Sequence, residues 1–467
     1  MAWTSSAAIL SNYDEVLKTF YLPAIQEQLN HDTILSDLID VNEKDISGKD
    51  ATIECHYGRT KAIGARPDVG VLPTADRQKF KTCKVPMKYN YARVAFTGPT
   101  IAATRDEKGS YARVVNTEIE GVVRDLQKDI NRQLWGCGYS VCGRWLATSS
   151  GTTVYDMQKL YTGNAVGGDG FGSTFGGKYF EENGGGTAVV MTTAGGNTFT
   201  VVTANVSSIS IAVSAVDASA TSHDSVTMTN PNITEATGTY YARYGAVPSS
   251  WTSATTSGAM RYEMMGLRGI VTDTDLDQIA LFSTSSNVGF TANDPLQGLA
   301  TSTYSFWKSH VMTHASGRYA GQRALTLDMM QQMFDKVERS AGKDIGPNLI
   351  ITTQAIRRKY LDLMQTDRRN VNTMSLDGGW EALSYNGVPL VVDPHDAIDG
   401  EIYFLTTADL QMYRMSDYEW MQKDGSVLSR ISNYDAYEAV LFRYSELGTT
   451  ARNTHGVICD LAYNPDR

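Results

Sequence analysis

The sequence contains little cysteine and no cysteine motif. Five cysteines occur in 467 residues, and no two of them form a C-x-x-C pair. Cys137 and Cys142 form an isolated C-x4-C without a companion pair, which is not the ligand set of a structural zinc site. The others are Cys55, Cys83 and Cys459. The pattern predicts five reduced thiols, as in a protein of a reducing compartment.

Further absences limit the class of protein. The sequence has no apolar run of ~18 residues, the length that a membrane-spanning helix needs. Residues 1–20 lack a basic region followed by an apolar core, so we expect no signal peptide and no passage through a membrane. The formal net charge is −10. This acidic balance argues against electrostatic binding of nucleic acid as the main task of the chain.

One stretch, residues 393–399, has the composition of an active site or a metal site. Its polar residues are Asp393, His395, Asp396 and Asp399. Carboxylates beside a histidine are what a metal site or a general acid–base pair requires. The stretch joins two apolar runs, 388–392 and 402–405, which are typical of strands, and it contains proline and glycine. We therefore predict an acidic turn rather than an active site.

Other motif candidates lack essential residues. Asp273, Asp275 and Asp277 are spaced like the start of a calcium loop, but Gln278 stands where that loop needs glycine. GGDGFGSTFGG, residues 167–177, lacks the Lys-Ser/Thr of a phosphate loop. We predict that the chain is not an enzyme and that it has no catalytic residue, no cofactor site and no metal site.

The chain divides into segments of different character. Residues 1–55 are amphipathic, and residues 56–92 are basic, interrupted by proline and too long for a simple connection. Residues 110–135 carry the strongest helical pattern. Near residue 149 the composition shifts to Gly, Ser, Thr and Val, which predicts a β-rich region as far as about residue 260. Helix and strand signals alternate after it.

The pattern over residues 110–135 predicts a helix roughly 39 Å long. Its apolar stripe consists of Val115, Ile119, Val122, Leu126, Ile130 and Leu134. Its opposite, charged face consists of Arg113, Glu120, Arg124, Lys128 and Arg132. Further along the chain we expect helices over 327–337 and 355–364 and a buried strand over 347–351.

The order of these segments resembles that of the major capsid proteins of tailed bacteriophages, which have the Hong Kong 97 fold. Three stretches carry the resemblance, namely YEMMGLRGIVTD (262–273), LSYNGVPLVVDPHDAIDGEIYFL (383–405) and YRMSDYEWMQKDGSVLSRISNYDAYEAVLFRYSELGTTARNTHGVICDL (413–461). The second is similar to the family's Gly-Val-Pro strand, acidic turn and strand ending in Tyr-Phe-Leu. The third is similar to its long strands that return through the peripheral domain.

The resemblance implies an α+β, Hong Kong 97-like fold. Its expected parts are an N-terminal arm (1–55), an E-loop (56–92), a peripheral or P domain with a long spine helix (93–148), an inserted all-β subdomain (149–262), an axial or A domain (263–411), P-domain return strands (412–450) and a C-terminal strand of the A domain (451–467). Gly98 and Pro99 form a candidate hinge before the spine helix.

The resemblance also implies a structural function. It is that of a virion protein that self-assembles as pentamers and hexamers into an icosahedral head enclosing double-stranded DNA, without sequence-specific binding. The implied partners are other copies of the chain, a portal at one vertex and a separate scaffolding protein, since Met1 leads almost directly into the arm. The family also allows a decoration protein. Assembly is expected in the host cytoplasm.

Basic residues are candidates for contact between copies of the chain, because the average charge is acidic and basic patches would complement it. These candidates are Arg59, Lys61, Arg66, Lys81, Lys84, Lys88, Arg357, Arg358, Arg368 and Arg369. Basic residues flanked by tyrosines also suit nucleic acid, so for residues 56–92 two interpretations stay open, a nucleic-acid site and an arm that lies on another subunit.

Two other classes of function stay open as well. The Ser/Thr/Gly-rich region and Trp251 suit a secreted β-rich adhesin or carbohydrate-binding protein. Asp393 and His395 suit a hydrolase. The size of the particle separates these classes, because only a shell protein forms very large assemblies.

Overall fold

The computed structural model describes most of the chain after residue 32, including parts of the region 149–260. The described residues are 33–43, 46–98, 110–138, 141–148, 154–158, 189–195, 198–201, 223–227, 240–243, 250–251, 261–276, 295–319, 321–341, 346–366, 373–375, 381–394, 396–422, 427 and 429–462. Residues 1–32 of the segment expected to be the N-terminal arm lie outside these residues. Two compact units are distinguished, Met1–His31 and Asp32–Arg467, and only the second is described below.

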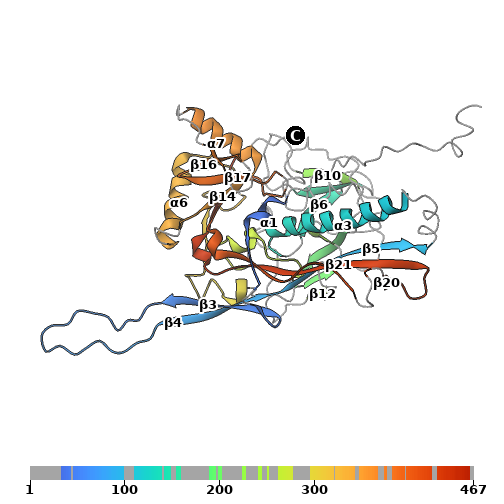
Figure 1. Ribbon diagram of the computed structural model, residues 1–467. Coiled ribbons are helices and arrows are strands. Elements are labelled where there is room, and N and C mark those ends of the chain that lie inside the picture. Colours follow the sequence, from blue (N-terminus) through green and yellow to red (C-terminus); the bar gives the residue numbers. More distant parts are fainter. Residues whose placement is uncertain are drawn as a thin grey trace, which may run out of the picture. The chain divides into compact units, whose positions relative to one another are not determined.

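Strands of the described residues form four sheets (Figure 1). Sheet I contains β1 (Asp40–Asn42), β19 (Leu410–Trp420), β21 (Ala436–Thr449), β20 (Ser429–Arg430) and β5 (Lys88–Thr97). Sheet II has the order β10 (His223–Thr227), β7 (Val154–Gln158), β6 (Val141–Thr148), β11 (Tyr240–Arg243), β8 (Val189–Gly195), β9 (Thr198–Val201) and β12 (Ser250–Trp251).

The other two sheets differ greatly in size. Sheet III has the order β13 (His310–Met312), β22 (Gly456–Ile458), β18 (Ile402–Leu405), β14 (Leu349–Thr352), β17 (Val388–Val392), β16 (Glu381–Tyr385) and β15 (Thr373–Ser375). Sheet IV contains β2 (Ile46–Ser47), β3 (Asp50–Gly58) and β4 (Lys79–Pro86), and β3 and β4 form a long antiparallel hairpin.

Helices cover both faces of sheet III. The helices of the described residues are α1 (Ile34–Leu38), α3 (Ser110–Trp135), α5 (Leu267–Ile270), α6 (Leu327–Ala341) and α7 (Gln354–Thr366), with short 3-10 turns η4 (Leu296–Gly298), η5 (Thr407–Asp409) and η6 (Arg452–Thr454). All four residues of β14 and of β18 are buried. A strand buried on both faces needs apolar residues without alternation, which explains the uninterrupted runs LIIT and IYFL.

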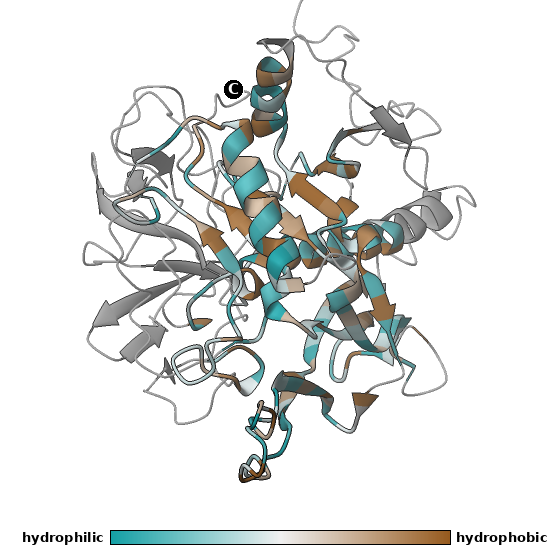
Figure 2. Cartoon of the chain, turned by 90° about the vertical axis from the view of Figure 1, so that its left-hand side faces the viewer, coloured by the Kyte–Doolittle hydropathy of each residue, from teal (hydrophilic) through white to brown (hydrophobic). Residues whose placement is uncertain are grey.

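Alternate residues of these strands reach two different cores. Ile350 and Phe404 pack with α6 and α7 residues such as Met333 and Ile356. Ile351 joins a second core with the C-terminal half of α3, including Leu134. In Figure 2 the left-hand side of Figure 1 faces the viewer. A helix that lies there in front of hydrophobic strands shows mostly hydrophilic residues toward the viewer.

Several predicted elements are confirmed. The helix predicted over 110–135 is α3, those predicted over 327–337 and 355–364 are α6 and α7, and the predicted strands are β14, β17 and β18. The buried side of α3 follows the predicted stripe, since Leu126 is 6% exposed and Ile130 and Leu134 are fully buried.

Three segment boundaries differ from the expected ones. Residues 88–97 form β5, which pairs with β21 along its whole length, so the last part of the segment 56–92 belongs to sheet I. The hairpin instead begins at Asp50, in the segment expected to be the arm. Residues 141–148 form β6, which pairs with β7 and β11 in sheet II. Strand pairing with distant partners sets these boundaries, and it is invisible in local composition.

Candidate interaction surfaces

The acidic stretch 393–399 contacts the end of α3. Asp393 accepts a hydrogen bond from the backbone N–H of Asp396 at 3.1 Å, which is the turn chemistry that the sequence predicted. Its second carboxylate oxygen accepts from Nε1 of Trp135 at 2.8 Å and from Asn131 at 3.3 Å. Asp393 is 1% exposed. The turn therefore fixes the position of α3 relative to the connection between β17 and β18.

Asp396 is the second anchor of this turn. Its carboxylate accepts from Nδ2 of Asn131 at 2.6 Å and lies 3.4 Å from Nζ of Lys128. His395, the other residue of the suspected active site, lies outside the described residues. Within the part of the chain that the structure describes, no group of three or more His, Cys, Asp or Glu side chains could hold a metal ion.

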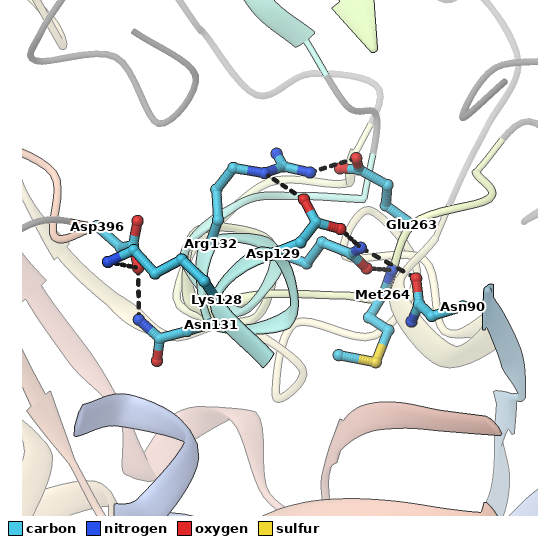
Figure 3. A network of polar contacts seen from close by, with 9 residues as sticks. Asn90, Lys128, Asp129, Asn131, Arg132, Glu263, Met264 and Asp396 are labelled. Carbon is cyan, nitrogen blue, oxygen red and sulfur yellow. Dashed lines mark hydrogen bonds and ion pairs between the residues drawn. The ribbon is translucent and has the colours of Figure 1, made fainter. Parts of the chain in front are cut away.

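A second buried network lies around the last turns of α3 (Figure 3). Arg132 binds Asp129 at 3.1 Å and Glu263 at 2.5 Å. Gln133 donates to Asp129 at 2.8 Å and to Asn90 of β5 at 3.0 Å. Its own side-chain oxygen accepts from the backbone N–H of Met264 at 3.0 Å. These bonds join α3 to sheet I and to residues 261–265.

This network corrects the expected charged face of α3. The sequence placed Lys128 and Arg132 opposite the apolar stripe, but Arg132 is 4% exposed. Lys128 is also largely covered, with 13% of its side chain accessible. Burying a cation is favourable only with a close partner of opposite charge. Glu263 and Asp396 supply these partners from distant parts of the sequence.

Asp275, the middle residue of the suspected calcium loop, is buried and forms a hydrogen bond within the chain. Asp275 is 5% exposed, and its carboxylate accepts from the backbone N–H of Thr301 at 2.8 Å. Arg452, fully buried, donates to the carbonyls of Ile270, Gly269, Trp307 and Thr274. The YEMMGLRGIVTD stretch is thus held from both ends by buried polar groups.

The hairpin of β3 and β4 presents the opposite kind of surface. Between its strands lies loop 59–78, whose apolar side chains reach solvent. Those that are most exposed are Ile63 (80%), Val69 (98%), Val71 (88%) and Leu72 (80%). Apolar side chains gathered on one exposed segment mark an interaction surface. The sequence predicted an interacting segment here on the strength of its basic residues, and the apolar contribution was missed.

Most of the basic candidates on the hairpin are exposed. Arg59, Lys61, Arg66, Lys81 and Lys84 all reach solvent. Arg66 donates to the carbonyls of Val71 and Ala65 at 2.9 and 3.1 Å, so its guanidinium shapes loop 59–78.

The remaining basic candidates fall into three groups. Lys88 is 7% exposed and donates to the carbonyl of Arg261, so it acts inside the chain and not on its surface. In α7, Arg358 is exposed and Arg357 is partly covered. Arg368 and Arg369 lie outside the described residues.

Aromatic side chains fix the root of the hairpin to the chain. The ring of Tyr57 stacks on that of Phe306, with centroids 4.9 Å apart and planes at 11°. Lys81 lies 5.6 Å above the centre of the Tyr304 ring. Cys55 and Cys83 pack with Trp307 in the same cluster. The strands of the hairpin are therefore attached to residues 299–307, and loop 59–78 lies beyond this attachment.

Sheet I presents a further aromatic surface. In β5, Asn90 contacts Gln133 of α3, so its neighbours Tyr89 and Tyr91 point to the other face. They are 50% and 56% exposed. Their rings meet that of Tyr444 in β21 edge-on, at 5.0 and 5.9 Å between centroids. This face is suited to contact with another apolar surface.

Comparison with solved structures shows what the fold is similar to. The cyanophage A-1(L) capsid asymmetric unit matches with a TM-score of 0.55 and 14% identity, over 97% of this chain and 99% of that chain. The capsid of an empty GTA particle matches with a TM-score of 0.48 and 9% identity, over 98% and 100% of the two chains. The SrpI encapsulin complex from Synechococcus elongatus matches with a TM-score of 0.44 and 8% identity, over 99% of each chain.

At the level of sequence, no family model and no curated protein matches this chain. The cyanophage match shows the fold on structural grounds. The chain has the mixed α and β architecture of Hong Kong 97-type capsid proteins, as the sequence predicted from its order of segments. Among the helices of the described residues, none is long and apolar enough to cross a membrane.

Proposed function

We propose that this chain is the major capsid protein of a tailed bacteriophage, a subunit that assembles as pentamers and hexamers into an icosahedral head around double-stranded DNA. The observation that carries the proposal is the match to a cyanophage capsid structure over nearly the full length of both chains. A fold alone does not define a function. The exposed surfaces described above supply the second argument, because they suit association between copies.

We propose the following assignment of the described elements to the parts of such a subunit. In this assignment α3 is the spine helix and, with sheet I, forms the P domain. Sheet III with α6 and α7 forms the A domain. The hairpin of β3 and β4 is the E-loop. Sheet II is the inserted β subdomain, and it begins with β6, before the shift in composition near residue 149.

The hairpin supports self-association most directly. Loop 59–78 exposes four large apolar side chains that a solitary soluble chain has no reason to leave uncovered. Its basic residues suit the acidic average charge of the other copies. The aromatic attachment at residues 299–307 would hold the hairpin ready to reach a neighbour. We propose that loop 59–78 lies on an adjacent copy of the chain.

We further propose that the chain acts through assembly rather than through catalysis. The carboxylates that resembled an active site, Asp393 and Asp396, accept hydrogen bonds from Trp135 and Asn131. Buried carboxylates committed in this way hold structure together. The proposal includes a separate scaffolding protein, a portal at one vertex and room for a decoration protein, with assembly in the host cytoplasm. The enclosed DNA would be held without sequence-specific contacts, in keeping with the net charge of −10.

The size of the purified particle tests the proposal. The full-length chain would be produced in bacterial cells, sedimented through a sucrose gradient and imaged by electron microscopy. We expect very large assemblies with five-fold and six-fold rings of subunits, either closed or irregular when no scaffolding protein is present. A chain that sediments only as a small species and is retained on polysaccharide would instead support the adhesin interpretation.

A further inference from the structure

Two thiols face each other where the hairpin joins the rest of the chain. Cys55 lies in β3 and Cys83 in β4, and their Sγ atoms are 2.9 Å apart. In the strand register Cys83 pairs with Ile53, and Cys55 pairs with Lys81. The two cysteines are therefore diagonal neighbours on one face of the hairpin, a position from which side chains reach across the strands.

The surroundings make this pair different from a lone buried cysteine. Cys83 is fully buried, whereas 8% of Cys55 is accessible. Both pack against Leu299 and Trp307, the residues to which the hairpin is attached. The thiol of Cys55 also lies 3.5 Å from the carbonyl oxygen of Thr450, after the end of β21. The pair thus lies at the point where sheet IV, residues 299–307 and the end of sheet I come together.

We propose that Cys55 and Cys83 form a redox switch, in which a reversible disulfide covalently joins β3 to β4 at the root of the hairpin. A disulfide needs its sulfur atoms about 2.05 Å apart, so the existing distance has to shorten by less than about 1 Å. Both residues belong to one chain. The switch therefore operates in the single subunit and does not depend on the proposed assembly.

The oxidant is a small disulfide such as oxidised glutathione, and the reaction is thiol–disulfide exchange. The Cys55 thiolate attacks one sulfur of the small disulfide, forms a mixed disulfide and releases one small thiolate. The Cys83 thiolate then attacks Sγ of Cys55 and releases the second small thiolate. Two protein thiols lose two electrons and two protons, and one small disulfide is reduced to two small thiols.

The order of the two attacks follows from the geometry. Only Cys55 is partly accessible, so the small disulfide meets it first. The hydrogen bond from the Cys83 thiol lowers the pKa of Cys55 and favours its thiolate, while the same interaction raises the pKa of Cys83. A more accessible thiol with a greater thiolate fraction is the faster nucleophile. Cys83 then acts as the resolving thiol.

Oxidation would lock the hairpin at its root. The disulfide closes the chain between residues 55 and 83, and this closed segment contains loop 59–78. Such a cross-link restricts the unfolded chain and keeps β3 and β4 paired when the rest of the hairpin opens. The oxidised form would keep β3 and β4 joined at the root of loop 59–78, whereas in the reduced form the two strands are held together there by non-covalent pairing alone.

The test begins with the purified full-length parent chain in mixtures of reduced and oxidised glutathione. Free thiols would be alkylated, and peptides would be mapped by mass spectrometry without reduction. We expect a cross-linked Cys55–Cys83 peptide that accumulates as the oxidised fraction rises and disappears with dithiothreitol. Trypsin cleavage in loop 59–78 should leave two fragments joined only in the oxidised chain. The thermal midpoint should shift upward on oxidation and return on reduction.

Variants separate the roles of the two thiols. Cys83→Ser should accumulate glutathione on Cys55, whereas Cys55→Ser should leave Cys83 largely unmodified. Cys459→Ser, which removes a buried thiol outside the pair, is the matched control and should form the cross-link as the parent does. If either hairpin serine variant fails to fold, the mapping on the parent chain still decides the question.

Two results would overturn the proposal. One is the absence of a Cys55–Cys83 cross-link at every glutathione ratio, including after refolding in oxidised glutathione, where burial does not block access. The other is a cross-link between either residue and a different cysteine in equal yield. An upward shift of the thermal midpoint that persists in Cys55→Ser would also contradict the assignment of the shift to this pair.

Discussion

The end of α3 and loop 59–78 of the hairpin both depart from the usual placement of residues. The end of α3 buries charged and polar side chains, whereas loop 59–78 exposes apolar ones. At the end of α3, Arg132 is buried and binds two carboxylates, and Gln133 makes three hydrogen bonds. In loop 59–78, Val69 and Val71 are 98% and 88% exposed. Charged groups are inside at the first place, and apolar groups are outside at the second.

The difference shows which region has all its interaction partners within one chain and which does not. At the end of α3, Arg132 is matched within the chain by Asp129 and Glu263, so this region needs no second molecule. The apolar residues of loop 59–78 receive no such cover from the described residues. Exposed apolar side chains of this kind contribute favourable free energy only when another surface removes them from water. The first region stabilises the subunit, and we infer that the second serves the assembly.

The largest effect is expected on assembly. Replacing Ile63, Val71 and Leu72 together by serine should abolish large particles and leave the stability of the subunit unchanged. The three residues are at least 80% exposed, so the isolated chain loses little buried apolar area. Sedimentation would measure assembly, and denaturant unfolding followed by circular dichroism would measure stability.

The control for the serine variant is Tyr434→Ser, which removes a side chain that is 69% exposed in the turn before β21. This control should still assemble. Normal closed shells from the triple variant would contradict the assignment of loop 59–78 to contact between copies.

The largest effect on the subunit itself is expected at the end of α3. Arg132→Met should lower the free energy of unfolding by about 3–5 kcal/mol, because Glu263 and Asp129 stay buried without their cation. Denaturant unfolding measures the change. The double variant Arg132→Met with Glu263→Met should recover part of the loss, since it removes the stranded carboxylate. A loss below about 1 kcal/mol, as for a surface ion pair, would show that this pair is open to solvent.

Sequence reasoning succeeded where local pattern decides the structure. The stripe ending in Ile130 and Leu134 predicted α3 with its bounds, and the apolar runs predicted β14, β17 and β18. Period and turn residues are properties of neighbouring positions, so they can be read without the fold. The fold itself was predicted from the order of the segments and agrees with the cyanophage match.

The same reasoning failed where distant residues decide the structure. Arg132 was placed on the charged face opposite the apolar stripe, and its burial was not predicted because its partner Glu263 lies 131 positions away. Lys88 was expected on a surface, but the pairing of β5 with β21 carries it into the interior. The exposure of the apolar residues in loop 59–78 was not predicted, because one or two apolar residues at a time among Gly, Pro and polar residues show no period. Their exposure is a property of the folded hairpin.

A smaller effect is expected where the backbone passes close to the end of α3. A Cβ at Gly266 would lie 2.5 Å from the carbonyl oxygens of Gln133 and Leu134. Gly266→Ala should therefore cost about 2–3 kcal/mol of unfolding free energy, because backbone atoms have to move. Gly121→Ala, within α3 itself, is the control, since nothing lies within 4 Å of the position that a Cβ at Gly121 would take.

Alanine at position 121 should stabilise the helix by about 0.5–1 kcal/mol, through its higher helix propensity. Both variants would be compared by denaturant midpoints at equal slope. Equal effects at the two positions would mean that the backbone at Gly266 is not tightly enclosed by α3.

The last effect depends on pH and concerns Glu446 of β21, whose carboxylate accepts a hydrogen bond from the backbone N–H of Met265. Burial raises the pKa of Glu446 from its usual 4.5 to about 7, against the opposing charges of Lys88 and Arg261 and the backbone N–H groups of Met265 and Leu447. Between these two pKa values the folded chain binds a proton that the unfolded chain has released. This contribution to stability is complete below about pH 4.5 and is lost as the pH rises through about 7.

Glu446→Gln keeps the shape of the side chain and removes this titration. The difference in unfolding free energy between the variant and the parent should therefore shift in favour of the variant by on the order of 2 kcal/mol between about pH 5 and about pH 8. Taking the difference cancels the titration of every other group that the two chains share. Glu438→Gln, in which the replaced carboxylate is partly exposed and paired with Arg93, is the control for the loss of a carboxylate elsewhere on β21. A difference that stays constant with pH, or shifts in favour of the parent, would mean that Glu446 is ionised in the folded chain at acid pH, with Lys88 and Arg261 outweighing the effect of burial.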